Sequence, residues 1–589
     1  MFRFPRLSVC RHLKYDALKP SATRLLPVAN SIHISLQQRN AHRSSIMPGP
    51  NKNFRHGPKR QRRTEPKRRE KSNEFDEVLQ LDVDTLLKRN KPEVDSAADT
   101  PTPPPPTLPE LFTEIEVNIE EISSTGDGLA LSDNKDHVYI VPFTVPGDKV
   151  LVKVVRHVKQ LSYSVTDFLK VIEPGPQRRD DAIGCKYFGK CSGCQLQMLS
   201  YEDQLAHKKR IVEKAYANFS GLIPELIPAI GDTFPSPQQY GYRTKLTPHF
   251  PAPPGRGKDN SESELQVPPI GFTYKNQRRH LDIEDCPLGT DIIRQGYKSE
   301  RKRVAENLPK YKKGATILLR ETTSRTPKEG TTDANGNSDS KPTIPITYEN
   351  KNKPEQESGD VITIDRPTYT EEKRCVTDQN ATSVEYIDDY LFTNKAGAFF
   401  QNNNSILSGF TEYIRQQSLA PNTDTSSTAA KPSSPIKYLL DAYSGSGLFT
   451  ITLSPLFKSS LGVDVAGDSI FSARDNARAN SLPNTGFAAA DAATLFKDVP
   501  YPADQTLLVI DPPRKGCSED FLQQLLTYGP RRVVYVSCNV HTQARDVAVM
   551  VQGDQKKGLR YDIESIRGFD FFPQTGHVEG VAVLNKVAI

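Results

Sequence analysis

The sequence predicts an α/β protein whose C-terminal part is a doubly wound, mostly parallel sheet. An OB-like β-barrel and a central α+β domain with a four-cysteine site are expected to precede it. From residue 438 onward, apolar strand segments alternate with helical stretches, which is typical of a doubly wound sheet. Before residue 175, short alternating segments follow one another at the spacing of a small barrel. Three of the eight cysteines lie between Cys185 and Cys194, which places the cysteine site in the middle of the chain.

Composition limits the classes to which the chain can belong. At 589 residues it is too long for one core of ordinary size, so about two or three domains are expected. With 46 prolines, 25% charged and only 36% hydrophobic residues, part of the chain is expected to stay unfolded. No run approaches the roughly eighteen apolar residues of a membrane helix, so no membrane partner is expected. Eight cysteines in so long a chain suit a reducing compartment with a metal site better than a disulfide framework.

Residues 1–107 are expected to form a disordered basic leader and a proline-rich linker. Residues 1–46 contain eight Lys or Arg and a single acid, the makeup of a mitochondrial presequence, although an unstructured basic leader has the same composition. The run 52–71 is typical of a nuclear-localisation signal or a nucleic-acid-binding tail. The sequence therefore predicts a mitochondrial location, a nuclear and cytoplasmic location, or both through dual targeting from Met1 and Met47.

Residues 108–175 are predicted to form the barrel. The P-T-P-P-P-P-T-L-P spacer at 101–109 marks its N-terminal boundary. Segments of strand length stand at 114–122, 137–143, 149–157 and 163–172, broken by the turns Gly126-Asp127-Gly128 and Pro146-Gly147-Asp148. The V-P-G-D-K-V segment that begins at Val145 and the basic residues after it resemble the TRAM module, an OB-like barrel that binds RNA. These basic residues are Arg156, Lys159 and Lys170. A five-stranded barrel taken alone can bind many ligands.

A central α+β domain is predicted for 176–395, with disordered low-complexity insertions at 251–269 and 322–377. Its cysteines form the pattern C-x5-C-x2-C, followed by a fourth in E-D-C-P-L-G. They are Cys185, Cys191, Cys194 and Cys286. Four thiolates suit either zinc or an iron–sulfur cluster, and the spacing does not separate the two.

Residues 396–589 are predicted to form the doubly wound domain and to bind an adenosyl ligand. The segment L-L-D-A-Y-S-G-S-G-L at 439–448 places an acid at a strand end and glycines after it, which let the backbone approach a ligand. Asp464 ends the second strand, where a carboxylate can accept both hydroxyls of a ribose, and Asp491 follows the third. This spacing favours an adenosyl group over a dinucleotide. A generic nucleotide-binding sheet is the alternative.

Two further strand ends carry chemistry. D-P-P-R-K-G begins at Asp511, after the apolar strand 507–510, and has Arg514 where enzymes that methylate exocyclic nitrogens carry an aromatic residue. The next strand ends V-S-C-N and so places Cys538 at the ligand-binding edge of the sheet. A buried structural cysteine is the alternative, but the polar neighbours of Cys538 favour a reactive thiol. Glu579 stands at the start of the final apolar strand, from which its side chain can reach the same edge.

Together D-P-P-R-K-G, V-S-C-N and H-V-E resemble the RNA 5-methyluridine methyltransferase family, and F-F-Q-N-N at 399–403 resembles the lead-in to its catalytic domain. The match spans about 110 to 589. The resemblance implies a class I S-adenosylmethionine-dependent methyltransferase fold and methylation of C5 of uridine in RNA, most often the T-loop uridine at position 54 of tRNA. It also implies roles for six residues: S-adenosylmethionine contacts from Gln401, Tyr443, Asp464 and Asp511, a nucleophile in Cys538 and a general base in Glu579. The family more often carries Glu where Asp464 stands.

For the four cysteines, the resemblance implies a [4Fe–4S] cluster, with zinc as the alternative, because ribosomal RNA members of the family have this pattern. The expected chemistry follows from the weak nucleophilicity of C5 of uracil. Addition of a thiolate to C6 turns C5 into an enolate carbon that can attack a sulfonium methyl. A base must then remove the C5 proton. The target base has to leave its stack, because the thiolate approaches the face of the ring.

Other functions remain open at this stage. Ribosomal RNA is the alternative to tRNA as substrate, and a monomer is expected. A cytosine-5 RNA methyltransferase is disfavoured, because Cys517 lacks the P-C or T-C setting of that chemistry. From a different class, the chain could be a nucleic-acid chaperone or repair factor that binds without turnover, a reading against which Cys538 and Glu579 argue.

Overall fold

The computed structural model describes most of the chain from residue 74 onward. The described residues are 74–90, 108–255, 265–328, 357–419, 435–490, 495–496 and 499–588, and all fall within one compact unit, Lys71–Ile589. The predicted presequence, the basic run, most of the proline-rich spacer and Asp491 lie outside the described residues. No described helix is long and apolar enough to cross a membrane.

The predicted barrel is confirmed. Five strands close in the order β1-β2-β3-β5-β4. They are β1 (Glu114–Ile122), β2 (Gly128–Leu131), β3 (Val138–Val141), β4 (Lys149–Val158) and β5 (Tyr163–Glu173). The four residues of β2 fall outside the ranges predicted from the sequence, because they follow directly on the Gly126-Asp127-Gly128 turn and are too few to show alternation.

A helix, α1 (Glu74–Asn90), lies inside the segment predicted to be a disordered leader and linker. Its apolar residues recur at the spacing of one helix face and pack against β2, β3 and β5 of the barrel. Those residues are Leu79, Val83, Leu86 and Leu87. The expectation of disorder therefore does not hold for 74–90, because this helix buries its apolar face on the barrel and is not a solvated tail.

The central region contains two small sheets, a hairpin and two helices. Its first sheet has the order β10-β9-β8-β11 and its second the order β13-β14-β12-β7. Their strands are β7 (Lys245–Leu246), β8 (His249–Phe250), β9 (Gly271–Thr273), β10 (His280–Asp282), β11 (Ala315–Thr316), β12 (Leu319–Pro327), β13 (Glu357–Asp365) and β14 (Tyr369–Val376). The remaining elements are α2 (Tyr201–Phe219), α3 (Asp291–Glu306) and the hairpin of β15 (Thr382–Ile387) and β16 (Tyr390–Lys395).

The prediction of a disordered insertion at 322–377 is wrong for the strands β12, β13 and β14. The polar composition of these strands led to the prediction of disorder. Several of their charged side chains are in fact buried as ion pairs. Glu321 is paired with Lys373 at 2.6 Å and Glu371 with Arg325 at 3.3 Å, and both glutamates are buried. Charges can be buried when they are paired with opposite charges, so a polar segment need not be a loop.

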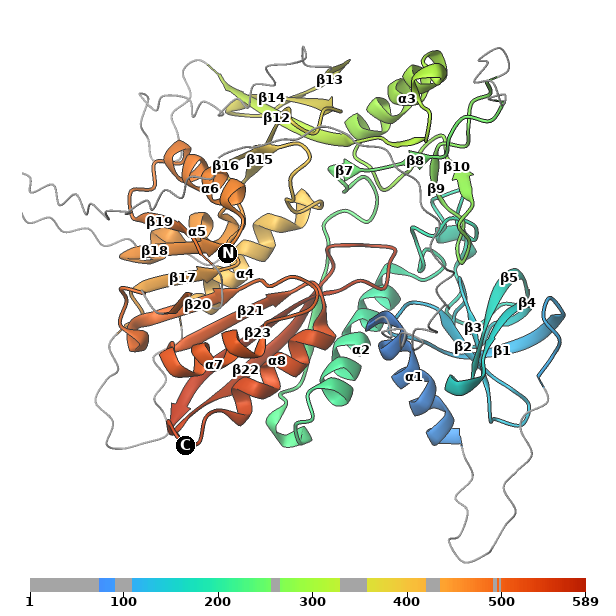
Figure 1. Ribbon diagram of the computed structural model, residues 1–589, viewed down its shortest axis with the longest axis horizontal. Coiled ribbons are helices and arrows are strands. Elements are labelled where there is room, and N and C mark those ends of the chain that lie inside the picture. The colour runs from blue at the N-terminus through green and yellow to red at the C-terminus, as the bar shows by residue number, and fades with distance from the viewer. Residues whose placement is uncertain are drawn as a thin grey trace, which may run out of the picture. The chain divides into compact units, whose positions relative to one another are not determined.

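The mostly parallel sheet predicted for the C-terminal region is confirmed, although one edge strand, β6, comes from the segment predicted as the central domain. Its eight strands have the order β19-β18-β17-β20-β21-β23-β22-β6 (Figure 1). They are β6 (Gly231–Phe234), β17 (Tyr438–Ala442), β18 (Ser459–Asp464), β19 (Thr485–Ala489), β20 (Thr506–Ile510), β21 (Arg532–Ser537), β22 (Leu559–Phe569) and β23 (Glu579–Ala588). Strands β17 to β21 are parallel, and β23 is antiparallel to both of its neighbours.

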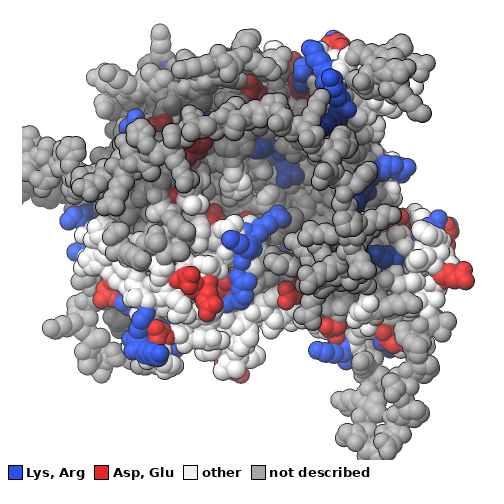
Figure 2. All heavy atoms as spheres, viewed as in Figure 1, with Lys and Arg blue, Asp and Glu red and all other residues white. Residues whose placement is uncertain are grey.

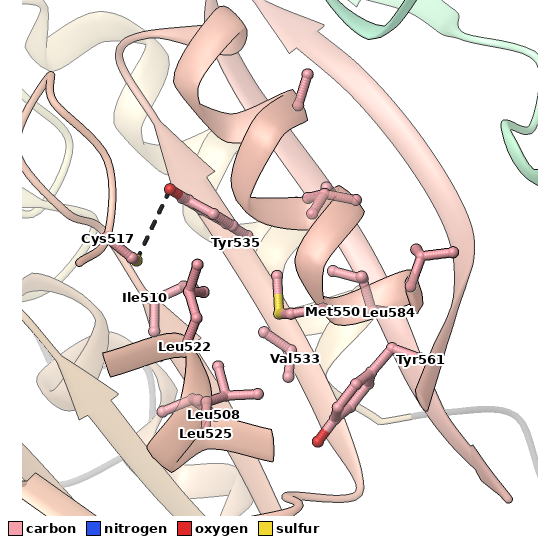
Figure 3. Packing of buried hydrophobic residues seen from close by; sticks show 14 of the residues in the cluster. Leu508, Ile510, Cys517, Leu522, Leu525, Val533, Tyr535, Met550, Tyr561 and Leu584 are labelled. Atoms are coloured by element: carbon pink, nitrogen blue, oxygen red, sulfur yellow. Dashed lines mark hydrogen bonds between the residues drawn. The ribbon is translucent and has the colours of Figure 1, made fainter. Parts of the chain in front are cut away.

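Helices cover both faces of this sheet, which explains why its central strands β20 and β21 are almost entirely apolar and buried. One face packs against α4 (Leu407–Ser418), α5 (Leu448–Leu453) and α6 (Gly467–Ala479), and the other against α2, α7 (Glu519–Tyr528) and α8 (Val540–Gln552). Along β20, Leu507 and Val509 point to the first face and Leu508 and Ile510 to the second. Figure 3 shows Leu508 and Ile510 packed with Leu522 and other side chains of the second face.

The strand order reverses direction at β17, which lies between β18 and β20. In open α/β sheets, ligands bind outside the carboxyl ends of the strands at this switch point. A ligand is therefore expected to bind at the segments that follow β17, β18, β20 and β21.

Candidate active site

The loop after β17 is shaped to accept a ligand. Tyr443, Gly445 and Gly447 have φ angles of 65°, 53° and 94°. A Cβ added at Gly447 would lie 3.0 Å from Ile451, whereas one added at Gly445 would meet no atom within 4 Å. The backbone thus turns tightly against α5 and leaves open space over Gly445.

Two buried polar atoms beside this loop have no hydrogen-bond partner among the described residues. One oxygen of Asp441 accepts hydrogen bonds from the backbone N–H and the hydroxyl of Thr450, at 2.9 and 2.6 Å, and its other oxygen has no partner. The hydroxyl of Ser444 is the second such atom. Buried polar groups are almost always hydrogen-bonded, so these two atoms suit a polar ligand such as S-adenosylmethionine.

Asp464 stands next to the same loop, as the sequence predicts. Its carboxylate accepts hydrogen bonds from the backbone N–H groups of Gly445, at 3.0 Å, and Ala466, at 2.7 Å. These bonds fix the carboxylate at the carboxyl end of β18. Val465, which follows it, is 74% exposed. Val465 was not predicted as a site residue. An apolar side chain directly after an acid at a strand end nevertheless indicates a site that can bind a flat ring.

The side chains of the other two expected cofactor residues, Tyr443 and Gln401, do not point clearly to the cofactor loop. The ring of Tyr443 packs 5.4 Å from that of Phe521 on α7, and its hydroxyl interacts with the thiol of Cys517. Its side chain thus faces the core, and its backbone shapes the loop. Gln401 follows β16, beside Asn402, whose carbonyl oxygen accepts a hydrogen bond from the Thr244 N–H at 2.9 Å. Among the described residues, the Gln401 side chain makes no hydrogen bond to the loop after β17.

Asp511, Cys538 and Glu579 converge at the carboxyl edge of the sheet. Asp511 follows β20, Cys538 follows β21, and Glu579 is the first residue of β23. Because β23 is antiparallel to β21, with Ser537 opposite Gly580, its first residue lies at the edge where the parallel strands end. The sequence predicts this convergence, and the three side chains are close enough to influence one another electrostatically.

Burial and mutual repulsion raise the pKa values of the groups at this site, and Arg514 is the cation that opposes these shifts. Burial raises the pKa of the Cys538 thiol to about 12, with Glu579 and Asp511 adding to the shift and Arg514, which is hydrogen-bonded to the thiol, opposing it. Burial also raises the pKa of Glu579 well above its ordinary value, and Asp511 adds to that shift. A cation bound here would favour the ionised form of each of these groups.

Asp511 is also close to Asp441, the acid beside the loop after β17. Burial raises the pKa of Asp511 to about 7, and the neighbouring Asp441 adds to it. Burial likewise raises the pKa of Asp441 to about 7. Both carboxyl groups therefore titrate near neutral pH.

The D-P-P-R-K-G loop is held against the start of α8. Asn539, the N-cap of α8, accepts a hydrogen bond from the His541 N–H at 3.1 Å and donates one to the Arg514 carbonyl at 3.0 Å. Gly516 has a φ of 76°, and a Cβ there would lie 2.5 Å from Asp546. A glycine is thus required at the end of this motif, and Asn539 ties Arg514 to the strand end that carries Cys538.

Cys517 lies in the core and not at the site. Its backbone N–H donates to Asp546 at 2.6 Å, and its thiol contacts the Tyr535 hydroxyl at 3.8 Å (Figure 3). This placement agrees with the sequence argument against a second catalytic cysteine.

Cys538 opens onto a cavity of about 480 Å³ whose walls come from parts of the chain far apart in sequence. Val78 of α1, Thr125 of the barrel and Gln195 line it together with Cys538. The Gln195 amide bridges two of these walls, donating to the Thr125 carbonyl at 2.6 Å and accepting from the Gly576 N–H at 3.0 Å. The sequence does not predict this cleft, because Val78, Thr125 and Gln195 belong to no recognisable motif.

The four cysteines of the central region line one cavity of about 110 Å³. Within the described part of the chain, no three His, Cys, Asp or Glu side chains stand in the arrangement of a formed metal site. The chemistry of the donor set nevertheless fits a thiolate-ligated centre, since the residues that share the cavity are Cys185, Cys191, Cys194 and Cys286.

Comparisons with known proteins agree with this geometry. The sequence model of the family described as tRNA (Uracil-5-)-methyltransferase matches residues 376–587, and that of the TRAM domain matches 110–161. The tRNA (uracil(54)-C(5))-methyltransferase of Schizosaccharomyces pombe is 40% identical over 576 residues, which cover 98% of this chain and 94% of the relative. The Saccharomyces cerevisiae protein of the same name is 39% identical and covers 87% of this chain and 81% of its own length.

A solved structure shows a similar fold. The tRNA (uracil-54, C5)-methyltransferase of Pyrococcus abyssi, in complex with S-adenosyl-L-homocysteine, matches with a TM-score of 0.52 and 22% identity. The match covers 80% of this chain and 100% of that one.

Proposed function

The chain belongs to the tRNA (uracil-5-)-methyltransferase family, and from this membership we propose that it methylates C5 of uridine 54 in tRNA with S-adenosylmethionine as methyl donor. One observation carries the assignment to this site. Cys538, Glu579 and Asp511 meet at one edge of the sheet, beside a cofactor loop, in a chain that resembles a fungal enzyme of this activity along nearly its whole length.

In the proposed reaction, the Cys538 thiolate adds to C6 of the uracil ring, and C5 becomes nucleophilic enough to take the methyl group. Arg514, hydrogen-bonded to the thiol, stabilises the thiolate. Glu579 then removes the C5 proton, and the bond between C6 and the sulfur breaks to release the product. Because Glu579 is buried, the carboxylate is poorly solvated and is a stronger base than an exposed glutamate.

S-adenosylmethionine supplies an electrophilic methyl group on a sulfonium centre. The chain's own residues would hold it at the carboxyl ends of β17 and β18. Asp464 suits the two ribose hydroxyls, and Val465 offers an apolar surface to the adenine ring. Asp441 and Asp511 provide negative charge for the cationic donor. Gln401 and Tyr443 complete the proposed set, Tyr443 through its backbone.

The pH dependence of cofactor affinity tests this electrostatic role. Asp441 and Asp511 each have a raised pKa of about 7. A bound cation lowers both values, so binding releases protons. The affinity for S-adenosylmethionine is therefore expected to rise from pH 5 to 7 by up to about tenfold per pH unit for each carboxyl group that loses its proton on binding, and to level off above pH 7. Titration calorimetry across this range checks the result.

S-adenosylhomocysteine, which lacks the sulfonium charge, is the control and should show a shallower slope of affinity against pH. Equal slopes for the two ligands would contradict the role.

For the four cysteines, the proposal is a [4Fe–4S] cluster, with zinc as the alternative. The support is a set of four thiols on one cavity wall, a donor set common to both centres. The role is structural, because Cys194 directly precedes Gln195, whose amide bridges the barrel and the loop that leads to Glu579.

The function itself is tested with purified protein and transcribed tRNA. One methyl group per tRNA is expected at uridine 54, and none on a tRNA with cytidine at that position. Mass spectrometry of nucleosides from cells without the gene provides the second measurement. If 5-methyluridine were lost from ribosomal RNA and kept in tRNA, the substrate assignment would be wrong.

A further inference from the structure

We infer that the turn between β9 and β10, together with the neighbouring cysteine-bearing segment 186–193, forms a docking surface for the phosphate backbone of tRNA outside the catalytic cleft. The inference rests on the proposed function, which supplies RNA as the partner. It concerns three exposed cations on this surface, namely Lys190, Arg278 and Arg279.

The turn is held rigidly between the barrel and the cysteine segment. Lys275 forms an ion pair with Asp127 of the barrel at 2.7 Å, and Asn276 donates to the carbonyl of Thr166 on β5 at 3.3 Å. On the other side, the Lys275 N–H donates to the Lys190 carbonyl at 2.8 Å. Figure 1 shows β9 and β10 next to the barrel, as these contacts require. A surface fixed in this way binds without a large entropy cost of ordering it.

Four of the nearby acids are already paired with other cations, and a fifth, Asp167 on β5, is hydrogen-bonded to Asn276 of the turn. Glu284 is 2.6 Å from Lys186, and Asp282 is 2.9 Å from Arg301. Asp285 is likewise bound to Arg294, and Asp127 to Lys275. Within the described part of the chain, no acidic side chain pairs with any of the three exposed cations.

The surface thus carries three exposed cations that form no ion pair with a described acidic side chain. On the face seen in Figure 2, Lys and Arg occur in small separate groups interspersed with Asp and Glu. A group of three cations without paired acids attracts a polyanion.

The geometry of the cations suits phosphate. The Arg279 guanidinium lies 4.3 Å from the centre of the Tyr274 ring, and this stacking holds its plane in one orientation. A fixed guanidinium can donate two parallel hydrogen bonds to one phosphate. Contacts of this kind position a nucleic acid without reading its sequence.

The surface is tied to two segments of the chain that also line the catalytic cleft. Asp127, to which the turn is tied, follows Ser124 and Thr125, which line the cavity of Cys538. Lys190 precedes Gln195, which lines the same cavity. An RNA whose target uridine enters the cleft would therefore extend its backbone over the turn.

The test is the double variant Arg278→Gln/Arg279→Gln, with full-length tRNA as substrate. The KM for tRNA is expected to rise about tenfold, with kcat within about twofold of wild type. The slope of log affinity against log salt should fall by about 1 to 2, because each phosphate contact contributes about 0.7 to 0.9. Arg278→Lys/Arg279→Lys keeps the charge and should restore the salt slope, but it should restore KM only in part, because lysine lacks the planar guanidinium.

The matched control is Lys312→Gln/Lys313→Gln, which removes the same charge from an exposed pair next to β11, at the opposite edge of the same four-stranded sheet from β10. It should leave KM and the salt slope unchanged. A wild-type KM and salt slope in the Arg278→Gln/Arg279→Gln variant would overturn the inference, and so would failure of the lysine pair to restore the salt slope. Failure of the proposed function is distinguishable, because wild-type protein would then methylate no tRNA at any salt concentration.

Discussion

Replacing Cys538 by alanine is expected to abolish methylation, whereas Glu579→Gln is expected to accumulate a covalent complex with tRNA. The two residues act at different steps of the proposed reaction. Without the thiol no addition to C6 takes place, so the rate should fall by at least about 10⁴-fold. With glutamine at 579, attack and methyl transfer can proceed, but the C5 proton has no acceptor and elimination is slow.

Denaturing gel electrophoresis with labelled tRNA separates these outcomes. Glu579→Gln should give a band of protein bound to RNA that survives denaturation, and Cys538→Ala should give none. A tRNA with 5-fluorouridine at position 54 should trap wild-type protein in the same way, since fluorine cannot leave C5 as a proton. Cys517→Ser is the control, because this cysteine lies in the core, and its activity should stay within a few fold of wild type.

The covalent mechanism would be wrong if Cys538→Ala retained methylation. It would also be wrong if neither the fluorinated tRNA nor Glu579→Gln trapped RNA. The raised pKa of Cys538 makes the result informative, since the thiol has to lose its proton in a site where burial and two acids oppose ionisation.

Protein purified without oxygen is expected to be brown and to contain about four irons per chain, as four thiolates around a [4Fe–4S] cluster require. Iron analysis and the visible absorption spectrum measure this directly. Cys194→Ser should remove nearly all of the colour and the iron. It should also lower the thermal unfolding temperature, since Gln195 depends on this segment for its position.

Cys375→Ser is the matched control for the cluster. Cys375 is a buried cysteine of the same central region that does not line the four-cysteine cavity. Its iron content should equal that of wild type. Colourless wild-type protein with one zinc per chain would assign zinc to the site instead.

By itself the sequence determined the doubly wound sheet, the barrel and the edge at which the reactive groups meet. Asp464, Asp511 and Cys538 each end or follow an apolar strand, so a local pattern of strand, turn and helix places them at the carboxyl edge. The position of Glu579 required one further inference, that the final strand begins at that edge, and the antiparallel pairing of β21 and β23 agrees with it.

Only the tertiary structure decided which surfaces surround this edge. Helix α1 and strands β12 to β14 lie in segments whose composition indicates disorder, because their apolar face or paired charges become visible only against a packing partner. The ring of Tyr443 faces the core because Phe521 packs against it there. The cleft over Cys538 depends on Gln195, whose amide contacts residues 70 and 381 positions away in the chain. Contacts over such separations arise from the packing of whole domains, and no local pattern of residues encodes them.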